Sequence, residues 1–138
     1  MSDGIVKDIE QLDKIYGSPA RASLIKVSDK MIPVYADWIM AVRLCVLSTV
    51  GPEGTDGSPR GDDGPVVRIA DEKTPLMPDW RGNNRADSLR NMVRDGRVSL
   101  MFMVPGSNNV VRVNGTAVLS IAKDLLTRSP TRVGVQEA

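Results

Sequence analysis

The sequence predicts a mainly β fold with flanking helices, in which short antiparallel strands form a sheet or a barrel. From residue 43 onward the chain consists of brief β-rich runs, which turn-forming clusters separate, as at residues 51–54 and 105–108. A single helix-like segment, residues 86–94, interrupts this series. Strands that follow one another so closely leave no room for crossover helices, so we expect antiparallel pairing rather than βαβ units.

Length and composition fit one globular domain. The 138 residues are enough to bury a core, and we divide them into a helical N-terminal part (1–40), a barrel core (43–120) and a C-terminal tail (121–138). Aromatic residues make up only 4%, so aliphatic side chains and the seven methionines must fill the interior. The net charge of +1 argues against duplex nucleic acid or an anionic membrane as a partner.

Cysteine and histidine usage narrows the chemistry. Cys45 is the only cysteine, so no internal disulfide can form, and we expect a reducing, cytoplasmic location. Its neighbours Leu44 and Val46 favour a buried hydrophobe over a nucleophile. Histidine is absent, which removes the commonest general base and metal ligand, and no metal site is expected. An enzyme of this composition would take its chemistry from a cofactor.

Two helices are predicted before the first strand. Residues 8–16 repeat apolar side chains at three- and four-residue spacing, which is typical of an amphipathic helix. A second helix is expected to begin at Ser28 or Asp29 as N-cap and to run to Ile39, with Pro33 tolerated in its first turn. We expect both helices to pack against the sheet.

The β-rich part predicts a series of short strands. They cover residues 44–50, 58–62, 66–70, 74–77, 98–104 and 110–118. In the tail, residues 122–127 fit a helical turn and residues 131–136 a strand start, and no closing element follows. We therefore expect a barrel that is incomplete at its C-terminus, with an open edge.

The loop before the helix-like segment is the first candidate site. Arg85 is expected in the first turn of that helix, where a cation opposes the positive end of the macrodipole. An anion held by free backbone N–H groups and Arg85 would remove this conflict, so we predict a phosphate site; an ordinary capped helix with solvated arginines is the alternative. The candidate residues are Pro78, Asp79, Trp80, Arg81, Asn83, Asn84 and Arg85.

The helix itself is expected to be capped and amphipathic. Asn83 or Asn84 would serve as N-cap, with Asp87 near the third helical position. Helical spacing places four apolar residues on one face and leaves the polar positions more exposed. The expected buried face is Ala86, Leu89, Met92 and Val93, and the more exposed positions are Arg85, Ser88, Asn91 and Arg94.

A second candidate is the segment at residues 58–64. Ser58 offers a hydroxyl, Arg60 a guanidinium and Gly61 close backbone approach, on a strand that could neighbour the first site. The alternative is a polar hairpin edge without a ligand.

Five motifs together resemble one protein family. The strings are SPRGD (58–62), LMPD (76–79), RGNNR (81–85), DSLRN (87–91) and VRVNG (111–115). The chain resembles pyridoxamine 5′-phosphate oxidase-like FMN-binding proteins over most of residues 5–120. The resemblance implies a split β-barrel, usually a homodimer with FMN held at the subunit interface.

The resemblance also implies roles for individual residues. Arg85 corresponds to a basic side chain on the FMN phosphate, and Arg60 to an arginine at the same end. Asn83 and Asn84 take the polar positions before Arg85, while the strand end at residues 78–79 lies along the flavin. In the true oxidase of this family, the residues that bind pyridoxamine 5′-phosphate lie largely in a C-terminal segment, which has no counterpart in this sequence. Pyridoxamine phosphate oxidation is therefore not the predicted reaction.

The sequence therefore predicts an FMN-dependent oxidoreductase with a small-molecule substrate of unspecified identity. Two alternatives remain open: a flavin-binding carrier or sensor without catalysis, and a degenerate split-barrel dimer without a ligand.

Overall fold

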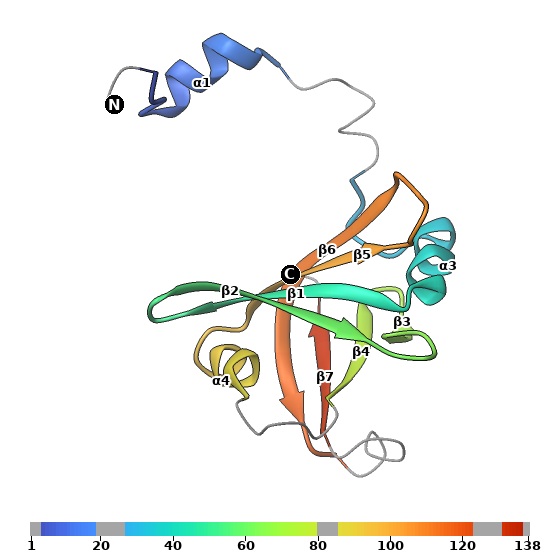
Figure 1. Cartoon of the computed structure of the whole chain (residues 1–138). Coiled ribbons are helices and arrows are strands. Elements are labelled where there is room, and N and C mark those ends of the chain that lie inside the picture. Colours follow the sequence, from blue (N-terminus) through green and yellow to red (C-terminus); the bar gives the residue numbers. More distant parts are fainter. Residues whose placement is uncertain (1–3, 19–26, 80–85, 123–130, 137–138) are drawn as a thin grey trace.

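The computed structural model describes residues 4–18, 27–79, 86–122 and 131–136. It contains a seven-stranded sheet in the order β2-β1-β5-β6-β7-β4-β3, in which every neighbouring pair is antiparallel. Figure 1 shows that the sheet is strongly curled, with α4 beside the β1–β2 hairpin. The mainly β, antiparallel prediction is confirmed. The strands are β1 (Leu44–Gly51), β2 (Gly54–Gly61), β3 (Arg68–Asp71), β4 (Thr74–Asp79), β5 (Arg97–Met103), β6 (Val110–Ser120) and β7 (Thr131–Gln136).

The strand predicted at residues 131–136 is confirmed as β7. It pairs with β6 on one side and with β4 on the other, so it connects the two parts of the sheet. The free edges of the described sheet are β2 and β3. The expected open edge therefore lies at those strands and not at the last one. Residues 123–130, which include most of the predicted helical turn, lie outside the described residues.

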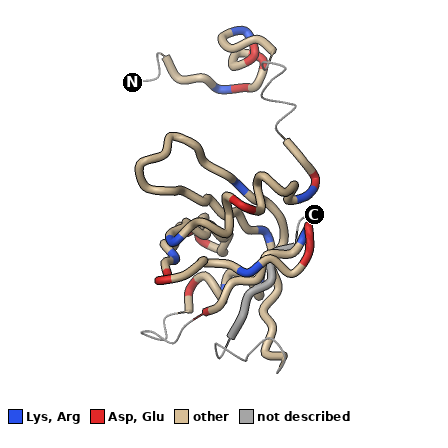
Figure 2. Tube along the Cα trace, turned by 90° about the vertical axis from the view of Figure 1, so that its right-hand side faces the viewer, with Lys and Arg blue, Asp and Glu red and all other residues tan. Residues whose placement is uncertain are grey.

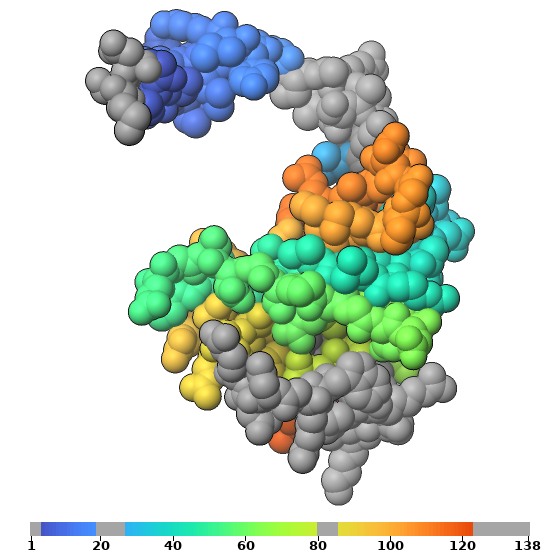
Figure 3. Space-filling model, in the orientation of Figure 1, coloured from blue at the N-terminus to red at the C-terminus, as the bar shows by residue number. Residues whose placement is uncertain are grey.

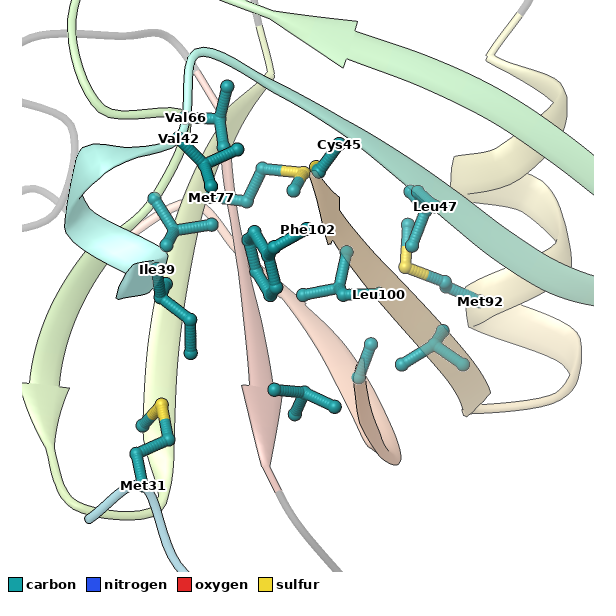
Figure 4. Close-up of a cluster of buried hydrophobic side chains, with 14 residues drawn as sticks. Met31, Ile39, Val42, Cys45, Leu47, Val66, Met77, Met92, Leu100 and Phe102 are labelled. Atoms are coloured by element: carbon teal, nitrogen blue, oxygen red, sulfur yellow. The ribbon is translucent and has the colours of Figure 1, made fainter. Parts of the chain in front are cut away.

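The core lies on the inner face of the sheet. Alternate residues of β1 and β5 are buried there, as the period-two pattern predicts. Phe102 and Leu100 are fully buried, and Figure 4 shows them pointing into one cluster with Cys45 and Met77. Aliphatic and sulfur-containing side chains fill most of this interior, which agrees with the scarcity of aromatic residues.

Helix α3 (Pro33–Ala41) begins later than predicted. Its N-cap is Ile32, not Ser28 or Asp29, and Pro33 is its first residue. Proline restricts the residue before it to extended backbone, so the helix cannot extend back past Ile32. The Ser28 hydroxyl instead accepts a hydrogen bond from the Lys30 N–H, at 3.3 Å. The predicted packing is confirmed, because Ile39 is fully buried and α3 contacts β3 and β6.

Helix α1 (Ile9–Tyr16) forms where the sequence predicts it. The Asp8 carboxylate caps it by accepting a hydrogen bond from the Gln11 N–H, at 2.8 Å. The predicted packing against the sheet is wrong, because no residue of α1 is buried. Figure 3 shows the helix, in blue, set apart from the rest of the described chain.

Helix α4 (Asp87–Arg94) starts differently from the prediction. Its N-cap is Ala86, whose φ of 52° is left-handed, and no side chain caps the helix. The proposed N-cap role of Asn83 or Asn84 is therefore wrong, and Arg85 precedes the helix instead of occupying its first turn. Asp87 is the first helical residue and not the third. Its negative charge therefore interacts favourably with the positive end of the helix macrodipole.

The buried face of α4 was predicted only in part. Met92 is buried, as predicted, and Leu89 is half-buried against the core. Val93 is 73% exposed, however, and Ser88, which was expected to be exposed, is buried. The reason is that α4 contacts the β1–β2 hairpin through polar groups: the Asn91 amide donates to the Thr49 hydroxyl at 3.0 Å, and the Ser88 hydroxyl donates to Asp56 at 3.4 Å.

An ion pair next to the end of α4 gives a testable pH dependence. The Arg97 guanidinium donates to the Asp95 carboxylate at 2.6 Å, and this bond lowers the pKa of Asp95 from 3.8 to about 2. A lowered folded-state pKa means that the stabilisation is present above pH 4 and is lost as the pH falls towards 2. We expect Asp95→Asn to reduce the melting temperature more at pH 6 than at pH 2.5, measured by thermal circular dichroism. Asp37→Asn, at an exposed position of α3, is the control, and an equal Asp95→Asn effect at both pH values would contradict the prediction.

Candidate functional site

The candidate site forms where the end of β2 meets the end of β4. These strands occupy distant places in the sheet order and are not hydrogen-bonded neighbours. The curl of the sheet brings them together, and Arg60 Nη1 lies 2.7 Å from Asp79 Oδ1. The structure thus joins the second candidate segment to the start of the first.

A small hollow lies at this junction. Its volume is about 180 Å³. Both predicted segments line it, together with apolar residues that the sequence interpretation did not assign to a site. The lining residues are Pro59, Arg60, Gly61, Asp62, Val66, Met77 and Pro78. Ser58 is half-buried on β2 and does not line the hollow.

The Arg60 guanidinium is only partly satisfied. Its side chain is 24% exposed, and one nitrogen is engaged by Asp79, whose side chain is 21% exposed. Nε is buried and has no hydrogen-bond acceptor among the described residues. Buried N–H groups nearly always have a partner, and a guanidinium presents a planar fork that matches a pair of phosphate or carboxylate oxygens. The Nε edge of Arg60 is therefore suited to an oxyanion.

Asp79 limits how much charge this site offers. Its carboxylate neutralises part of the guanidinium charge, so an anion would share Arg60 and not replace Asp79. The pair also fixes the direction of the guanidinium, because Asp79 holds it from the opposite strand. An ordered donor loses less entropy on binding than a free surface arginine.

Cys45 lies opposite Arg60 in the β1–β2 pair. It is fully buried, and this burial raises the pKa of its thiol to about 11, against the smaller opposing effect of Arg60. The thiol is thus neutral at physiological pH and is not an activated nucleophile. The prediction of a buried hydrophobe is confirmed.

The rest of the first candidate site lies outside the described residues: Trp80, Arg81, Asn83, Asn84 and Arg85. The described chain ends at Asp79, in contact with Arg60, and resumes at Ala86. The two ends of this loop are thereby fixed by β4 and α4. The phosphate role of the loop stays a prediction.

Two kinds of feature are absent from the described segments. Within them, no group of three or more histidine, cysteine, aspartate or glutamate residues is arranged to hold a metal ion. No helix in the same part of the chain is long and apolar enough to cross a membrane.

Comparison with known families gives one extended match. Residues 31–136 match the family model described as pyridoxamine 5′-phosphate oxidase. This range contains every strand of the sheet and both sides of the Arg60–Asp79 junction. A sequence comparison with curated proteins finds no match.

Solved structures share the fold at low sequence identity. A candidate pyridoxamine 5′-phosphate oxidase from Lactobacillus delbrueckii is 19% identical with a TM-score of 0.66, covering 80% of this chain and 93% of its own. HupZ from Group A Streptococcus, as a single-residue variant, is 18% identical with a TM-score of 0.61, covering 78% and 96%. A protein described as F420 reductase is 12% identical with a TM-score of 0.55, covering 74% and 91%. At these identities the likeness establishes the fold alone.

Proposed function

This chain belongs to the pyridoxamine 5′-phosphate oxidase family, and from this premise we propose that it binds FMN and acts as a flavin-dependent oxidoreductase on a small molecule. The family has a flavin-binding, oxidoreductase-like fold, which supports the general assignment. The choice of FMN is our proposal, because the structural relatives include an F420 reductase.

The observation that carries the proposal is the unsatisfied edge of Arg60. A phosphate placed there would accept hydrogen bonds from buried Nε and from the remaining guanidinium N–H groups, while Asp79 keeps Nη1. If β2 were only a polar hairpin without a ligand, buried Nε would be left without an acceptor among the described residues. Arg85, predicted from the sequence, would add a second cation to the phosphate.

The size of the hollow indicates how much of the cofactor it can hold. Pockets for whole ligands of this size range from about 300 to 1,000 Å³, and the hollow holds about 180 Å³. It therefore fits the phosphate end, and the flavin ring would extend over the end of β4 at Pro78. A second subunit would supply the remaining wall, so we propose a homodimer with FMN at the interface, an arrangement common in the family.

The chain's own residues would bind and orient the cofactor. When bound, the flavin supplies the hydride or electron transfer that the side chains described here cannot perform. Arg60 would hold the phosphate, Asp79 would position Arg60, and Val66 and Met77 would exclude water from the inner wall of the hollow.

A visible absorption scan tests cofactor binding. We expect purified protein incubated with FMN to keep flavin absorption bands after desalting, whereas protein incubated with riboflavin should lose them, because riboflavin has no phosphate for Arg60. Reduced nicotinamide should then bleach the FMN-loaded protein if it is an oxidoreductase. Stable FMN binding without turnover with nicotinamides, oxygen or dyes would indicate a carrier or sensor. Equal retention of FMN and riboflavin, or retention of neither, would contradict the proposed site.

A further inference from the structure

Helix α1 has an apolar face that no part of the described chain covers. Ile9, Leu12 and Tyr16 share one side at helical spacing, and Ile9 and Tyr16 are 70% and 78% exposed. An isolated helix shorter than about 12–15 residues is marginal in water, and α1 has only 8. Its capped, regular form is therefore best explained by a surface on which this face packs.

The charges around that face indicate what kind of surface it fits. At 100° per residue, Asp13 borders the apolar side, while Lys14 lies on the opposite side. Lys14 is also paired with Glu10, at 3.0 Å. Helices that bind anionic membranes carry cations on their polar face in excess. A carboxylate at the border of this face instead favours a protein surface that presents a cation next to apolar side chains.

The outer face of the sheet presents such a surface. Leu44, Met101 and Val110 are 43%, 38% and 49% exposed there, on the face opposite the core. The strand register arranges them in two adjacent rows across β1, β5 and β6. We call the six residues of these two rows the outer-sheet patch. One row is Leu44, Met103 and Val110, and the other is Val46, Met101 and Arg112. Arg112, which is exposed, supplies a cation at the border of the patch.

We infer that α1 of one chain lies across the outer-sheet patch of a second copy, with Asp13 towards Arg112, and that the second chain returns the same contact. The apolar face of α1 and the outer-sheet patch are both exposed within one chain. Figures 1 and 2 view the molecule from directions 90° apart, and both show α1 away from the sheet. Twofold symmetry would fill both patches at once. The inference rests on the proposed dimer.

The exchange would also place α1 beside the candidate FMN site. Pro59 and Gly61, which line the hollow, pair with Val46 and Leu44 of the patch. A helix seated on the patch would thus lie next to the strand that carries Arg60.

Disulfide trapping between two differently tagged, co-expressed chains tests the inference directly. Leu12→Cys in one full-length chain and Met101→Cys in the other should form a disulfide-linked pair that carries both tags. Lys14→Cys on the opposite side of α1, combined with Met101→Cys, should not. The native Cys45 should not form disulfides in this experiment, because it is buried and the pKa of its thiol is raised to about 11. As a second measurement, Leu12→Asp should raise the dimer dissociation constant by about ten- to a hundredfold.

The possible results separate the inference from the proposed function. A dimer without the mixed disulfide overturns the placement of α1 and leaves the FMN dimer standing. A disulfide only within one chain, in a Leu12→Cys, Met101→Cys double variant, assigns α1 to its own sheet and also overturns the inference. A monomer at all concentrations contradicts both the inference and the proposed dimer. Co-sedimentation with phosphatidylserine vesicles that Leu12→Asp abolishes, without the mixed disulfide, would assign the helix to a membrane instead.

Discussion

Replacing Phe102 by alanine is expected to lower the free energy of unfolding by about 3–5 kcal/mol. Among the described residues Phe102 is the largest fully buried side chain, and it lies near the end of β5, where it pairs with Cys45 of β1 and Val111 of β6. The truncation removes apolar contacts and leaves a cavity that neighbouring strands cannot fill without changing register. Chemical denaturation followed by circular dichroism measures the effect.

Val118→Ala is the matched control for this change. Val118 lies on β6 and is 64% exposed, so its truncation should change stability by roughly 0.5 kcal/mol or less. Because the total stability of a domain is about 5–15 kcal/mol, Phe102→Ala should leave a marginal fold. A loss similar to that of Val118→Ala would show that the β1–β5–β6 interior is not the cooperative core.

The inner faces of the strands could be predicted because the burial pattern is local. In β5, Val98, Leu100 and Phe102 are buried and alternate with less buried residues, so a period of two in the sequence corresponds directly to the two faces of the strand. The order of the strands could not be predicted in the same way. The insertion of β7 between β6 and β4 depends on pairing between distant segments, which no local pattern encodes.

The misplaced face of α4 has a physical cause. Hydrophobic spacing favours Val93 as a core residue, but α4 packs on β1 through the Asn91–Thr49 hydrogen bond as well as through buried Met92. Gly51 permits this contact, since a Cβ at that position would lie 2.6 Å from the Asn91 Oδ1 atom. A polar contact between distant segments therefore contributes to which side of the helix faces the sheet, and propensity rules omit such contacts.

The candidate site was predicted in part. Four of the candidate residues, Arg60, Gly61, Pro78 and Asp79, come from separate segments and meet at one junction. The direct ion pair between Arg60 and Asp79 was not predicted, because it depends on the curl of the sheet. Val66 and Met77 were missed as site residues, since a buried aliphatic residue at a strand end resembles any other core position.

Arg60→Met is expected to weaken FMN binding by roughly ten- to a hundredfold, because a charge-assisted hydrogen bond contributes about 1.5–3 kcal/mol. Riboflavin binding should not change, since it has no phosphate. Arg97→Met removes an arginine that is 72% exposed and far along the chain from the hollow, so it should leave the affinity for FMN unchanged. Fluorescence quenching of the flavin on titration with protein measures all of these affinities, at a temperature where each variant remains folded.

The Arg60–Asp79 ion pair allows a more specific test of the phosphate position. Once Arg60 is removed, the carboxylate of Asp79 faces the phosphate without a counter-ion, and like charges at this distance repel. Adding Asp79→Asn to Arg60→Met should therefore recover part of the lost FMN affinity. If the double variant binds FMN no better than Arg60→Met, then the phosphate does not approach this junction. If Arg60→Met weakens FMN and riboflavin binding equally, the arginine acts through the fold of β2 and β4 and does not touch the phosphate.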